Sequence, residues 1–235
     1  MKKTGVVVGR MDTNFCDLHA TDEKAYILGL WCADGYHRTS SIGLSNTDER
    51  LVHAFYQFFL KLFDKNRLRL RVYTNPIFYD KSFGENLAKH LGIEKLSQLY
   101  LKKSVLPTIH LYVNSRPLLR TFVRARKNIN MLPRENIKAY FAGRFDGDGS
   151  IAKDLRSDCR IVYTDRAEAF IDRELLREIG ITQTNVYEYA QAHTFCLYIF
   201  RSESKQFVNL IREYSRTQKL VSVPSRDLTS HFLTK

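Results

Sequence analysis

The chain has 235 residues, which is long enough to bury a substantial core as one large domain or two small ones. Its 37 Lys and Arg residues against 25 Asp and Glu give a net charge of +12, which indicates a polyanionic partner and leaves ribosomal, RNA-binding and membrane-surface proteins as alternatives. The four cysteines have no paired spacing, which argues against a zinc site and a disulfide framework.

The composition also indicates whether the protein is located inside or outside the cell. Reduced thiols are typical of an intracellular protein, and residues 6–8 form too short an apolar run for a signal peptide. No run approaches the length of a membrane span, so we expect no membrane partner. We therefore expect an intracellular location, in the cytoplasm or nucleoid, with an organelle as the alternative.

Residues 1–21 carry little pattern and are expected to form an N-terminal extension. The stretch at residues 24–35 then occurs a second time at residues 138–149, 114 positions later. Six of its twelve positions are identical: Lys24/Lys138, Ala25/Ala139, Tyr26/Tyr140, Gly29/Gly143, Asp34/Asp148 and Gly35/Gly149. A repeat at half the chain length predicts two related halves, residues 22–130 and 131–235, that meet about a pseudo-twofold axis.

Each copy of the repeat predicts a helix that ends at Asp-Gly, with the glycine in a left-handed cap conformation. Small residues lie four apart in both helices, Gly29 with Ala33 and Gly143 with Gly147. Such faces let two helix backbones approach closely. The sequence therefore predicts that these two helices pack against each other.

This packing would bring Asp34 and Asp148 side by side at one end of the helix pair. Two carboxylates at a helix C-terminus repel each other and the local dipole. A divalent cation relieves that repulsion, and oxygen-only ligands favour Mg²⁺. One helix ending in Asp-Gly would indicate only a capped core helix, but two matched copies argue against that interpretation.

The rest of the first half alternates between strands and helices. Residues 35–46 predict a hairpin, and residues 51–63 a helix with an aromatic core face. Residues 66–74 are the clearest strand, with apolar side chains on one side and a basic row on the other. That row consists of Arg67, Arg69, Arg71 and Tyr73. It can be merely solvated surface, but arginine with an interspersed tyrosine suits phosphates and guanine edges, and we favour contact with nucleic acid.

Residues 75–107 have no counterpart in the second half and predict an insertion lying over the first sheet. A short helical segment lies within it, at residues 83–91. Residues 108–114 alternate again, with His110 and Tyr112 outward, and a helix at residues 117–126 closes the first half.

The second half repeats this order without the insertion. Its pattern predicts a hairpin, a helix, two strands and a helix, at residues 150–164, 165–179, 182–201 and 203–215. One face of the two strands carries Asn185, Tyr187, Tyr189 and Gln191. Each half is therefore expected to be helix, two strands, helix, two strands, helix, which is an α+β arrangement.

Residues 27–35 and 141–149 resemble the two LAGLIDADG motifs of single-chain homing endonucleases, and residues 132–150 match the second motif especially closely. The resemblance extends over residues 22–220. Two positions depart from the family pattern: Cys32 replaces the usual first Asp, and Arg144 replaces an apolar residue.

The resemblance implies two pseudo-symmetric αββαββα halves whose antiparallel sheets form a saddle over duplex DNA, with the motif helices at the axis. Asp34 and Asp148, with the backbone carbonyls of Ala33 and Gly147, would hold Mg²⁺, with Mn²⁺ as a substitute.

A lysine near the end of each half commonly organises the attacking water in this family, which makes Lys127 and Lys219 the candidates. Asn46 lies where the family often has a water-ordering residue, whereas Tyr163 has the matching place in the second half, so the two sites are expected to be unequal. The expected DNA contacts are Arg38, Arg67, Arg69, Arg71, Tyr73, His110, Tyr112, Arg160, Asn185, Tyr187, Tyr189 and Gln191.

The resulting prediction is a monomeric, Mg²⁺-dependent endonuclease that cuts both strands of double-stranded DNA at a long target site. One alternative is a maturase, in which the same fold binds intron RNA. The other is a non-catalytic DNA-binding protein, against which the presence of both Asp34 and Asp148 argues.

Overall fold

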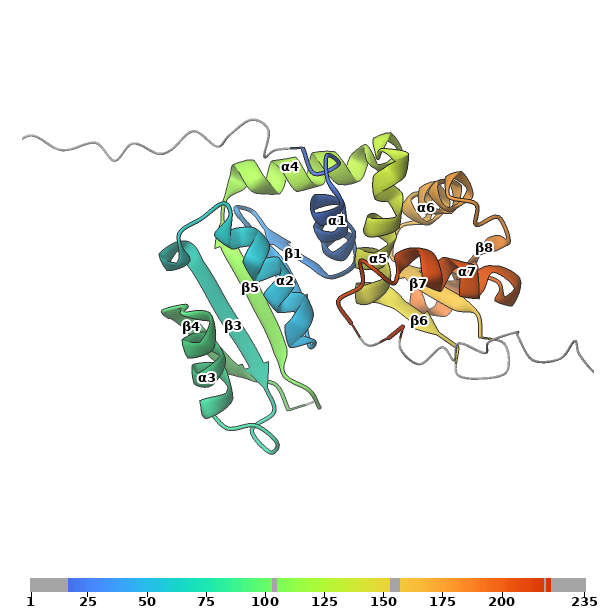
Figure 1. The fold of residues 1–235 in the computed structure, drawn as a ribbon. Coiled ribbons are helices and arrows are strands. Elements are labelled where there is room, and N and C mark those ends of the chain that lie inside the picture. The colour runs from blue at the N-terminus through green and yellow to red at the C-terminus, as the bar shows by residue number, and fades with distance from the viewer. Residues whose placement is uncertain (1–16, 103–104, 153–156, 218, 221–235) are drawn as a thin grey trace, which may run out of the picture.

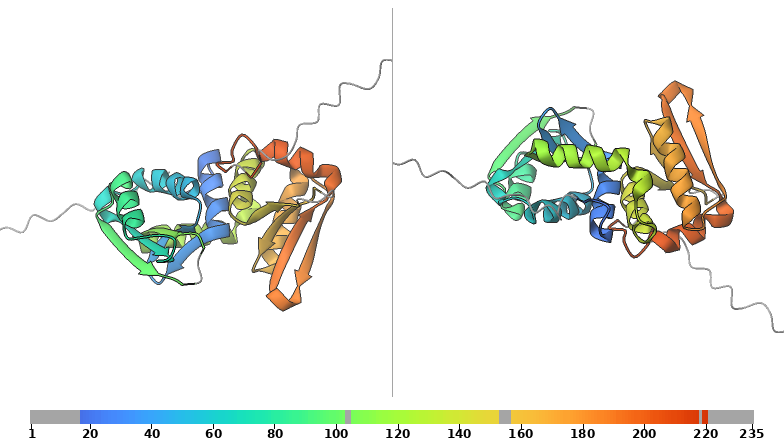
Figure 2. Two further views of the ribbon diagram at one scale, coloured as in Figure 1. Left: turned by 90° about the horizontal axis from the view of Figure 1, so that it is seen from below. Right: turned by 90° about the horizontal axis from the view of Figure 1, so that it is seen from above.

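The computed structural model describes residues 17–102, 105–152, 157–217 and 219–220, so most of the predicted N-terminal extension lies outside the described residues. A pair of helices stands between two β-sheets (Figures 1 and 2). The first half consists of α1 (Asp22–Asp34), β1 (Gly35–Arg38), β2 (Ser41–Asn46), α2 (Glu49–Leu60), β3 (Leu68–Thr74), α3 (Ser82–Leu91), β4 (Lys95–Tyr100), β5 (Thr108–Asn114) and α4 (Arg116–Lys127). The second half consists of α5 (Ile137–Asp148), β6 (Gly149–Ile151), β7 (Cys159–Tyr163), α6 (Arg166–Glu178), β8 (Thr184–Tyr189), β9 (Thr194–Ile199) and α7 (Arg201–Ile211).

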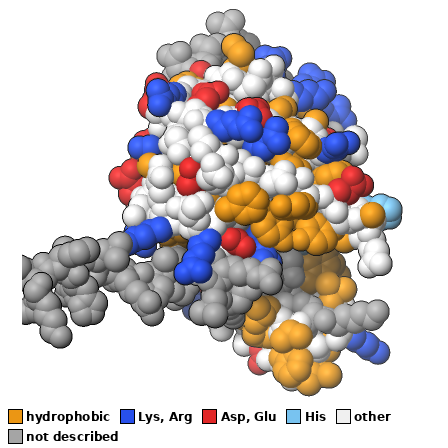
Figure 3. Space-filling view, turned by 90° about the vertical axis from the view of Figure 1, so that its right-hand side faces the viewer, with side chains coloured by type: hydrophobic (Ala, Val, Ile, Leu, Met, Phe, Trp, Pro, Cys, Tyr) orange, Lys and Arg blue, Asp and Glu red, His pale blue; other side chains and the backbone are white. Residues whose placement is uncertain are grey.

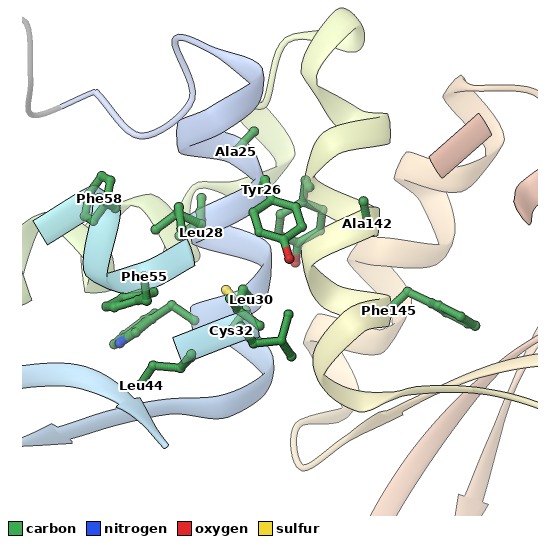
Figure 4. Packing of buried hydrophobic residues seen from close by; sticks show 14 of the residues in the cluster. Ala25, Tyr26, Leu28, Leu30, Cys32, Leu44, Phe55, Phe58, Ala142 and Phe145 are labelled. Atoms are coloured by element: carbon green, nitrogen blue, oxygen red, sulfur yellow. The ribbon is translucent and has the colours of Figure 1, made fainter. Parts of the chain in front are cut away.

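The two motif helices, α1 and α5, lie side by side at the centre of the molecule (Figure 1). Both are apolar on nearly all sides, and such a helix is stable only when it is buried all round. Residues 25–32 of α1 and 139–146 of α5 are accordingly all buried. Figure 4 shows Tyr26 between the two helices, while Leu28 and Phe145 point away from each other into the cores of the two halves.

Glycine sets the distance between α1 and α5, as the repeat predicts. A Cβ atom on Gly29 would lie 2.0 Å from the carbonyl oxygen of Tyr140, and one on Gly143 would lie 2.0 Å from the carbonyl oxygen of Tyr26. Near the other end, a Cβ on Gly147 would lie 2.4 Å from the Cβ of Ala33. The backbones are therefore in direct contact, and no larger residue fits at these positions.

The glycines that end the motif helices do not have the predicted left-handed conformation. Gly35 and Gly149 are extended, with φ of −62° and −81°, because each helix passes directly into a strand. Glycine is required there for space instead: a Cβ would lie 2.2 Å from the carbonyl oxygen of Trp31 in the first case and 2.4 Å from Phe145 in the second.

The first sheet has the strand order β1-β2-β5-β3-β4, and all its neighbours are antiparallel except β3 and β4. The prediction that residues 75–107 lie over the sheet therefore holds only for α3, whose Gly84 lies against Leu96 and Gln98 of β4, whereas β4 itself is a strand of the sheet. The chain leaves β3, forms α3 and returns as β4 in parallel pairing, so the insertion widens the sheet at its edge. A parallel partner needs a crossover of this kind, because two parallel strands cannot be joined by a hairpin.

The core of the first half is aromatic, as the helix pattern predicts. Phe55 of α2 lies edge-to-face with Phe59 at a ring separation of 4.9 Å, and Trp31 of α1 packs on Phe122 of α4 at 5.1 Å. Apolar side chains of β3 and β5 complete this core, since both strands bury every second residue. The opposite face of the sheet is left to polar and aromatic side chains.

The second sheet has the order β6-β7-β9-β8 and is antiparallel throughout. Helices α6 and α7 pack on it, and Asp165 caps α6 by accepting hydrogen bonds from Ala167 N at 2.7 Å and Glu168 N at 3.4 Å. Within the described part of the chain, no helix is long and apolar enough to cross a membrane.

Arg144, which replaces an apolar residue of the motif, is buried in the second half. Its guanidinium lies 3.4 Å from carboxylate oxygens of Asp172 and Glu168 and stacks over the ring of Tyr163 at 4.3 Å. Asp172 also accepts hydrogen bonds from the hydroxyls of Tyr140 and Tyr163. A buried cation is tolerated here because its charge and its donors are all matched.

The helix contact makes a stability prediction. We expect Gly143→Ala to lower the free energy of unfolding by about 2–4 kcal/mol, because the added methyl group meets rigid backbone. Gly84→Ala is the matched control, since the nearest atom to a Cβ there is the end of the flexible Gln98 side chain. This control should be neutral or mildly stabilising, as alanine is the better helix former. Urea unfolding measures both; equal effects would contradict the close-contact interpretation.

Candidate active site

Asp34 and Asp148 are the last residues of α1 and α5 and lie at the same end of the helix pair. Asp34 also lies against the partner helix, because its Oδ2 would be 2.7 Å from a Cβ on Gly147. Strands β1 and β6 begin at the next residues, so each carboxylate is held where a helix turns into a sheet. The two halves thus bring one carboxylate each to a shared site.

Both carboxylates carry raised pKa values. Burial raises the pKa of Asp34 to about 6, and the negative charge of Asp148 raises it further, while a hydrogen bond from Asn46 opposes the shift. Burial also raises the pKa of Asp148, against the opposing effect of Arg144 and Lys219. The two groups are therefore close enough to repel each other, as the sequence predicts, and a cation at this point would relieve the repulsion.

Asn46, the last residue of β2, contacts Asp34 directly. Its amide Nδ2 donates to Asp34 Oδ2 at 2.8 Å, and its Oδ1 accepts a hydrogen bond from the backbone N–H of Asp48 at 2.7 Å. Tyr163 has the same place at the end of β7, since Leu44 pairs with Gly35 as Ile161 pairs with Gly149. Its hydroxyl donates into the core, to Asp172 at 2.8 Å. The surroundings of the two carboxylates are therefore unequal.

Lys219 reaches the same end of the helix pair from the segment that follows α7. Its ammonium donates to the carbonyl oxygens of Asp146 at 2.6 Å, Gly147 at 2.9 Å and Gly149 at 3.2 Å. Burial lowers the pKa of Lys219, while the charges of Asp146, Asp34 and Asp148 oppose that shift. The C-terminal end of α5 is therefore already a cation-binding group of carbonyls.

A pocket of about 380 Å³ opens beside this group. It is lined by Asp34, Ser45, Asn46, Thr47, Asp48, Leu51, Thr108, Asp146, Gly147 and Lys219. Among the described residues no cluster of three or more His, Cys, Asp and Glu side chains is arranged to hold a metal ion. The groups that could hold a divalent ion here are two carboxylates and backbone carbonyls, and hard oxygen ligands of this kind suit Mg²⁺.

Lys127 does not lie in this site, so that prediction is wrong. It ends α4, and two residues before it the carbonyl of Ala125 contacts His19 Nε2 at 3.2 Å, just ahead of α1. The end of α4, and with it Lys127, therefore lies near the N-terminal end of α1, the length of that helix away from Asp34; Figure 1 shows α4 passing over this end of α1. Thirteen helical residues span about 20 Å. The chain after α4 leads back into α5, whereas the chain after α7 passes the carboxylates.

Asp146 is a residue of the site that the sequence analysis missed. It is 1% exposed, and its carboxylate accepts hydrogen bonds from Tyr26 and from residues 215–217. The available signal was in the motif itself, since Asp146 has the place of the first Asp, which Cys32 replaces in the first copy.

The exposed face of the first sheet combines arginines with aromatic rings. Tyr73 packs on His110 at 4.9 Å, and the Arg71 guanidinium lies over the Tyr112 ring at 5.5 Å. Burial lowers the pKa of His110 to about 4, so the ring is neutral at pH 7. Side chains of Arg38 and Arg69 also lie on this face, by the strand register, and the Tyr36 ring packs on His110 at 5.2 Å.

Arg67 is an exception on this half. It ends the 3-10 turn η2 (Lys65–Arg67) rather than lying in β3. Its guanidinium stacks over Phe63 at 4.6 Å and donates to the carbonyl of Asn114 at 3.3 Å, at the end of the sheet. The prediction that Arg67 belongs to the basic row is therefore wrong, because the strand begins only at Leu68.

The second sheet repeats the combination of tyrosine and arginine. Arg160 lies over the ring of Tyr198 at 4.8 Å, and Tyr187 packs on the same ring at 5.1 Å. Asn185 and Tyr189 share this face with Tyr187 by strand alternation. Figure 3 shows basic side chains around a band of exposed hydrophobic side chains on this side of the molecule.

Gln191 is outside that face. The chain leaves β8 at Tyr189 and turns through η5 (Ala190–Ala192), which ends at His193 with a φ of 49°. The prediction that Gln191 continues the row is wrong, because strand alternation stops where this turn begins.

The two repeated helices, the paired sheets and the shared carboxylates define a two-motif α+β protein, and comparison with known proteins shows which proteins it is similar to. Residues 21–125 match the family model described as a LAGLIDADG-like domain. The whole fold is similar to I-DmoI in complex with DNA and manganese, with a TM-score of 0.54 at 16% identity over 83% of this chain and 97% of that one. Residues 21–125 therefore form a LAGLIDADG-like domain, and the chain as a whole has the fold of these two-motif proteins.

Further similarities agree with that assignment. The homing endonuclease I-WcaI bound to its DNA recognition sequence has a TM-score of 0.55 at 12% identity, over 92% of this chain and 95% of that one. The N-terminal LAGLIDADG domain of DUF199/WhiA has a TM-score of 0.50 at 14% identity, over 88% of this chain and 96% of that one.

A curated relative is a subunit of the A-type ATP synthase of Methanopyrus kandleri, 30% identical over 179 residues. The match covers 74% of this chain but 14% of that protein. This chain thus corresponds to a small part of that relative.

The raised pKa of Asp34 makes a pH-dependent prediction. A carboxyl whose pKa rises from 3.8 to about 6 on folding contributes stability that is present below about pH 4 and is lost as the pH rises through 6. We therefore expect Asp34→Asn to be more stable than the wild type at pH 8 in a chelating buffer, by about 1–3 kcal/mol. The gain should shrink as the pH falls below 6. Thermal unfolding between pH 4.5 and 8 measures it.

Asp48→Asn is the control, because its effect on stability should change with pH in the opposite direction. The hydrogen bond from Arg50 lowers the pKa of Asp48, so its carboxylate contributes stability at neutral pH that is lost only in acid. A stability difference for Asp34→Asn that does not change with pH would contradict the raised pKa.

Proposed function

We propose that this protein is a site-specific DNA endonuclease that cuts both strands of a long target by divalent-metal catalysis. The observation that carries the proposal is the meeting of Asp34 and Asp148, one from each half, at the end of a helix pair whose backbones touch. Both have raised pKa values because they are partly buried, which is an expensive arrangement for a protein that only binds DNA.

Binding would use the exposed faces of the two sheets. Stacked arginine and tyrosine side chains on both faces supply charge for phosphates, donors for base edges and flat apolar surface for sugars and bases. The net charge of +12 supports a long phosphodiester partner. I-DmoI and I-WcaI, whose folds this chain shares, form complexes with their DNA.

Asp34, Asp148 and the backbone carbonyls of Ala33 and Gly147 are the groups that would hold the metal ions. Divalent ions bound there would supply an activated water and neutralise charge at the scissile phosphates. Mg²⁺ is the proposed ion, with Mn²⁺ as a substitute; I-DmoI structures have been determined with manganese, magnesium and calcium. The Gly147 carbonyl already accepts a hydrogen bond from an ammonium group, which supports its affinity for cations.

The remaining side chains would act on water and phosphate. The Asn46 amide holds the Asp34 carboxylate in place through its 2.8 Å hydrogen bond. The Lys219 ammonium would stabilise negative charge on a phosphate or orient the attacking water, since it lies in the pocket beside Asp34. We propose that one chain acts as a monomer, because its two halves supply both carboxylates, and that it acts inside the cell.

The test is incubation with a randomised duplex library and Mg²⁺, followed by sequencing of the cut ends. We expect cuts at one long sequence and no cuts in excess chelator. Asp34→Asn and Asp148→Asn should each reduce the cutting rate by about a thousandfold or more, because each removes a metal ligand. DNA affinity should be unchanged or higher, since a carboxylate repels phosphate. Cutting by either variant at the wild-type rate would contradict the mechanism.

The unequal surroundings of the two carboxylates predict an order of strand cleavage. We expect Asn46→Ala to slow the cutting of one strand by about tenfold, so that nicked duplex accumulates, because Asp34 loses its hydrogen-bond donor. Tyr163→Phe is the control: it removes the matching polar group, whose partner is in the core, and should leave the ratio of the two strand rates unchanged. Strand-resolved gels of end-labelled duplex measure both. Equal slowing of both strands by Asn46→Ala would contradict the prediction.

A further inference from the structure

Asp146 has more hydrogen-bond donors around it than a helix residue needs. Its carboxylate is 1% exposed and lies in the last turn of α5. The donors are Tyr26 Oη at 2.8 Å, Ser215 Oγ at 2.6 Å, the backbone N–H of Arg216 at 2.7 Å and Thr217 Oγ1 at 2.8 Å. Three of the four come from one short segment about seventy residues further along the chain.

That segment leads directly to Lys219. Helix α7 ends at Ile211, and the chain then passes the end of α5, where Asp146 holds residues 215–217. Thr217 Oγ1 in turn accepts a hydrogen bond from the backbone N–H of Lys219 at 3.4 Å. Leu220, the next residue, is 2% exposed and fixes the far side of the segment. The backbone of Lys219 is thus held on both sides.

The hydrogen bonds to Asp146 affect two free energies: the cost of burying its carboxylate and the cost of ordering Lys219. A buried carboxylate is costly, and charge-assisted hydrogen bonds from several donors are what offset that cost. An ammonium that occupies one place costs conformational entropy, both of the lysine side chain and of the chain segment that carries it. Fixing residues 215–217 removes the contribution of the chain segment to that cost, so that only the side chain of Lys219 must be ordered for its ammonium to lie among the carbonyls of Asp146, Gly147 and Gly149.

The first half has no equivalent anchor at the matching position. The repeat places Cys32 where the second half has Asp146. Cys32 is buried, and burial raises the pKa of its thiol to about 12, so it stays neutral and is a weak acceptor. The anchor therefore belongs to one half, the half that delivers Lys219.

We propose that Asp146 is a positioning residue for Lys219: it fastens the segment after α7 to the end of α5 and thereby fixes the ammonium beside Asp34 and Asp148. The role in catalysis rests on the proposed endonuclease function, whereas the positioning itself does not. In this proposal Asp146 acts through Lys219, because its carboxylate oxygens are already occupied by four donors of the protein.

The activity test is a double-mutant cycle with Asp146→Asn, Lys219→Met and the double variant. Asp146→Asn should slow cleavage by about tenfold or more, with DNA affinity changed less than threefold. The double variant should be no slower than Lys219→Met alone, because a positioning residue has no further effect once its target is gone. If the double variant slows cleavage by the product of the two single effects, the proposal is wrong.

Asp172→Asn is the matched control, because Asp172 is an equally buried carboxylate of the same half with tyrosine and arginine donors. It should lower the melting temperature, and its effect on cleavage should multiply with that of Lys219→Met. If Asp146→Asn does not fold, Ser215→Ala with Thr217→Val removes two donors and leaves the carboxylate in place, and the same cycle applies.

A second measurement does not depend on cleavage. The acetylation rate of the Lys219 amine, followed by mass spectrometry, should rise about fivefold or more in Asp146→Asn, because the ammonium is no longer held by the carbonyls. Asp172→Asn should leave that rate unchanged. An unchanged rate in Asp146→Asn would overturn the positioning role. Absence of cutting by the wild type, with the labelling result as expected, would refute the endonuclease function alone.

Discussion

The rest of the structure depends on the reciprocal contact of two glycines with two carbonyl groups. Gly29 lies on the backbone of Tyr140, and Gly143 lies on the backbone of Tyr26, so backbone alone sets the spacing of α1 and α5. That spacing leaves the carboxylate of Asp34 against Gly147 and near Asp148, where the two charges repel. Close packing therefore stabilises the contact between the two halves. The same packing brings two carboxylates together at the end of the helix pair, and their repulsion lowers the stability. Such a conflict between stability and arrangement is typical of a functional site.

Most of the fold could be predicted because its signals are local. The repeat located the helix pair, and side-chain alternation located β3 and β5 with their outward residues. Strand β4 was missed because its exposure alternates only weakly and its parallel partner lies across a helix, which no local pattern records. The conformation of Gly35 and Gly149 was wrong for a related reason: the residue type indicates that space or flexibility is needed, and only the packed neighbour shows which.

Some residues of the candidate site could also be predicted from local signals, and others could not. Asp34 and Asp148 lie within the repeat, which was enough to bring them together, and Asn46 was placed by the resemblance to the family. The lysines were chosen by their position after a last helix, and sequence distance does not tell which way the chain turns. Lys219 lies at the site and Lys127 at the far end of the helices. Asp146 was overlooked because its importance lies in partners about seventy residues away.

The edge strand β4 has a consequence for the size of any target. Among the described residues the first sheet has one strand more than the second, and each strand adds about 4.8 Å to the width of a sheet. Laid along a duplex that rises about 3.4 Å per base pair, that width corresponds to one or two base pairs. A sheet pair of unequal width has no symmetric footprint, so its two half-sites would differ in length as well as in sequence, and the point of cleavage would lie off the centre of the contacted DNA.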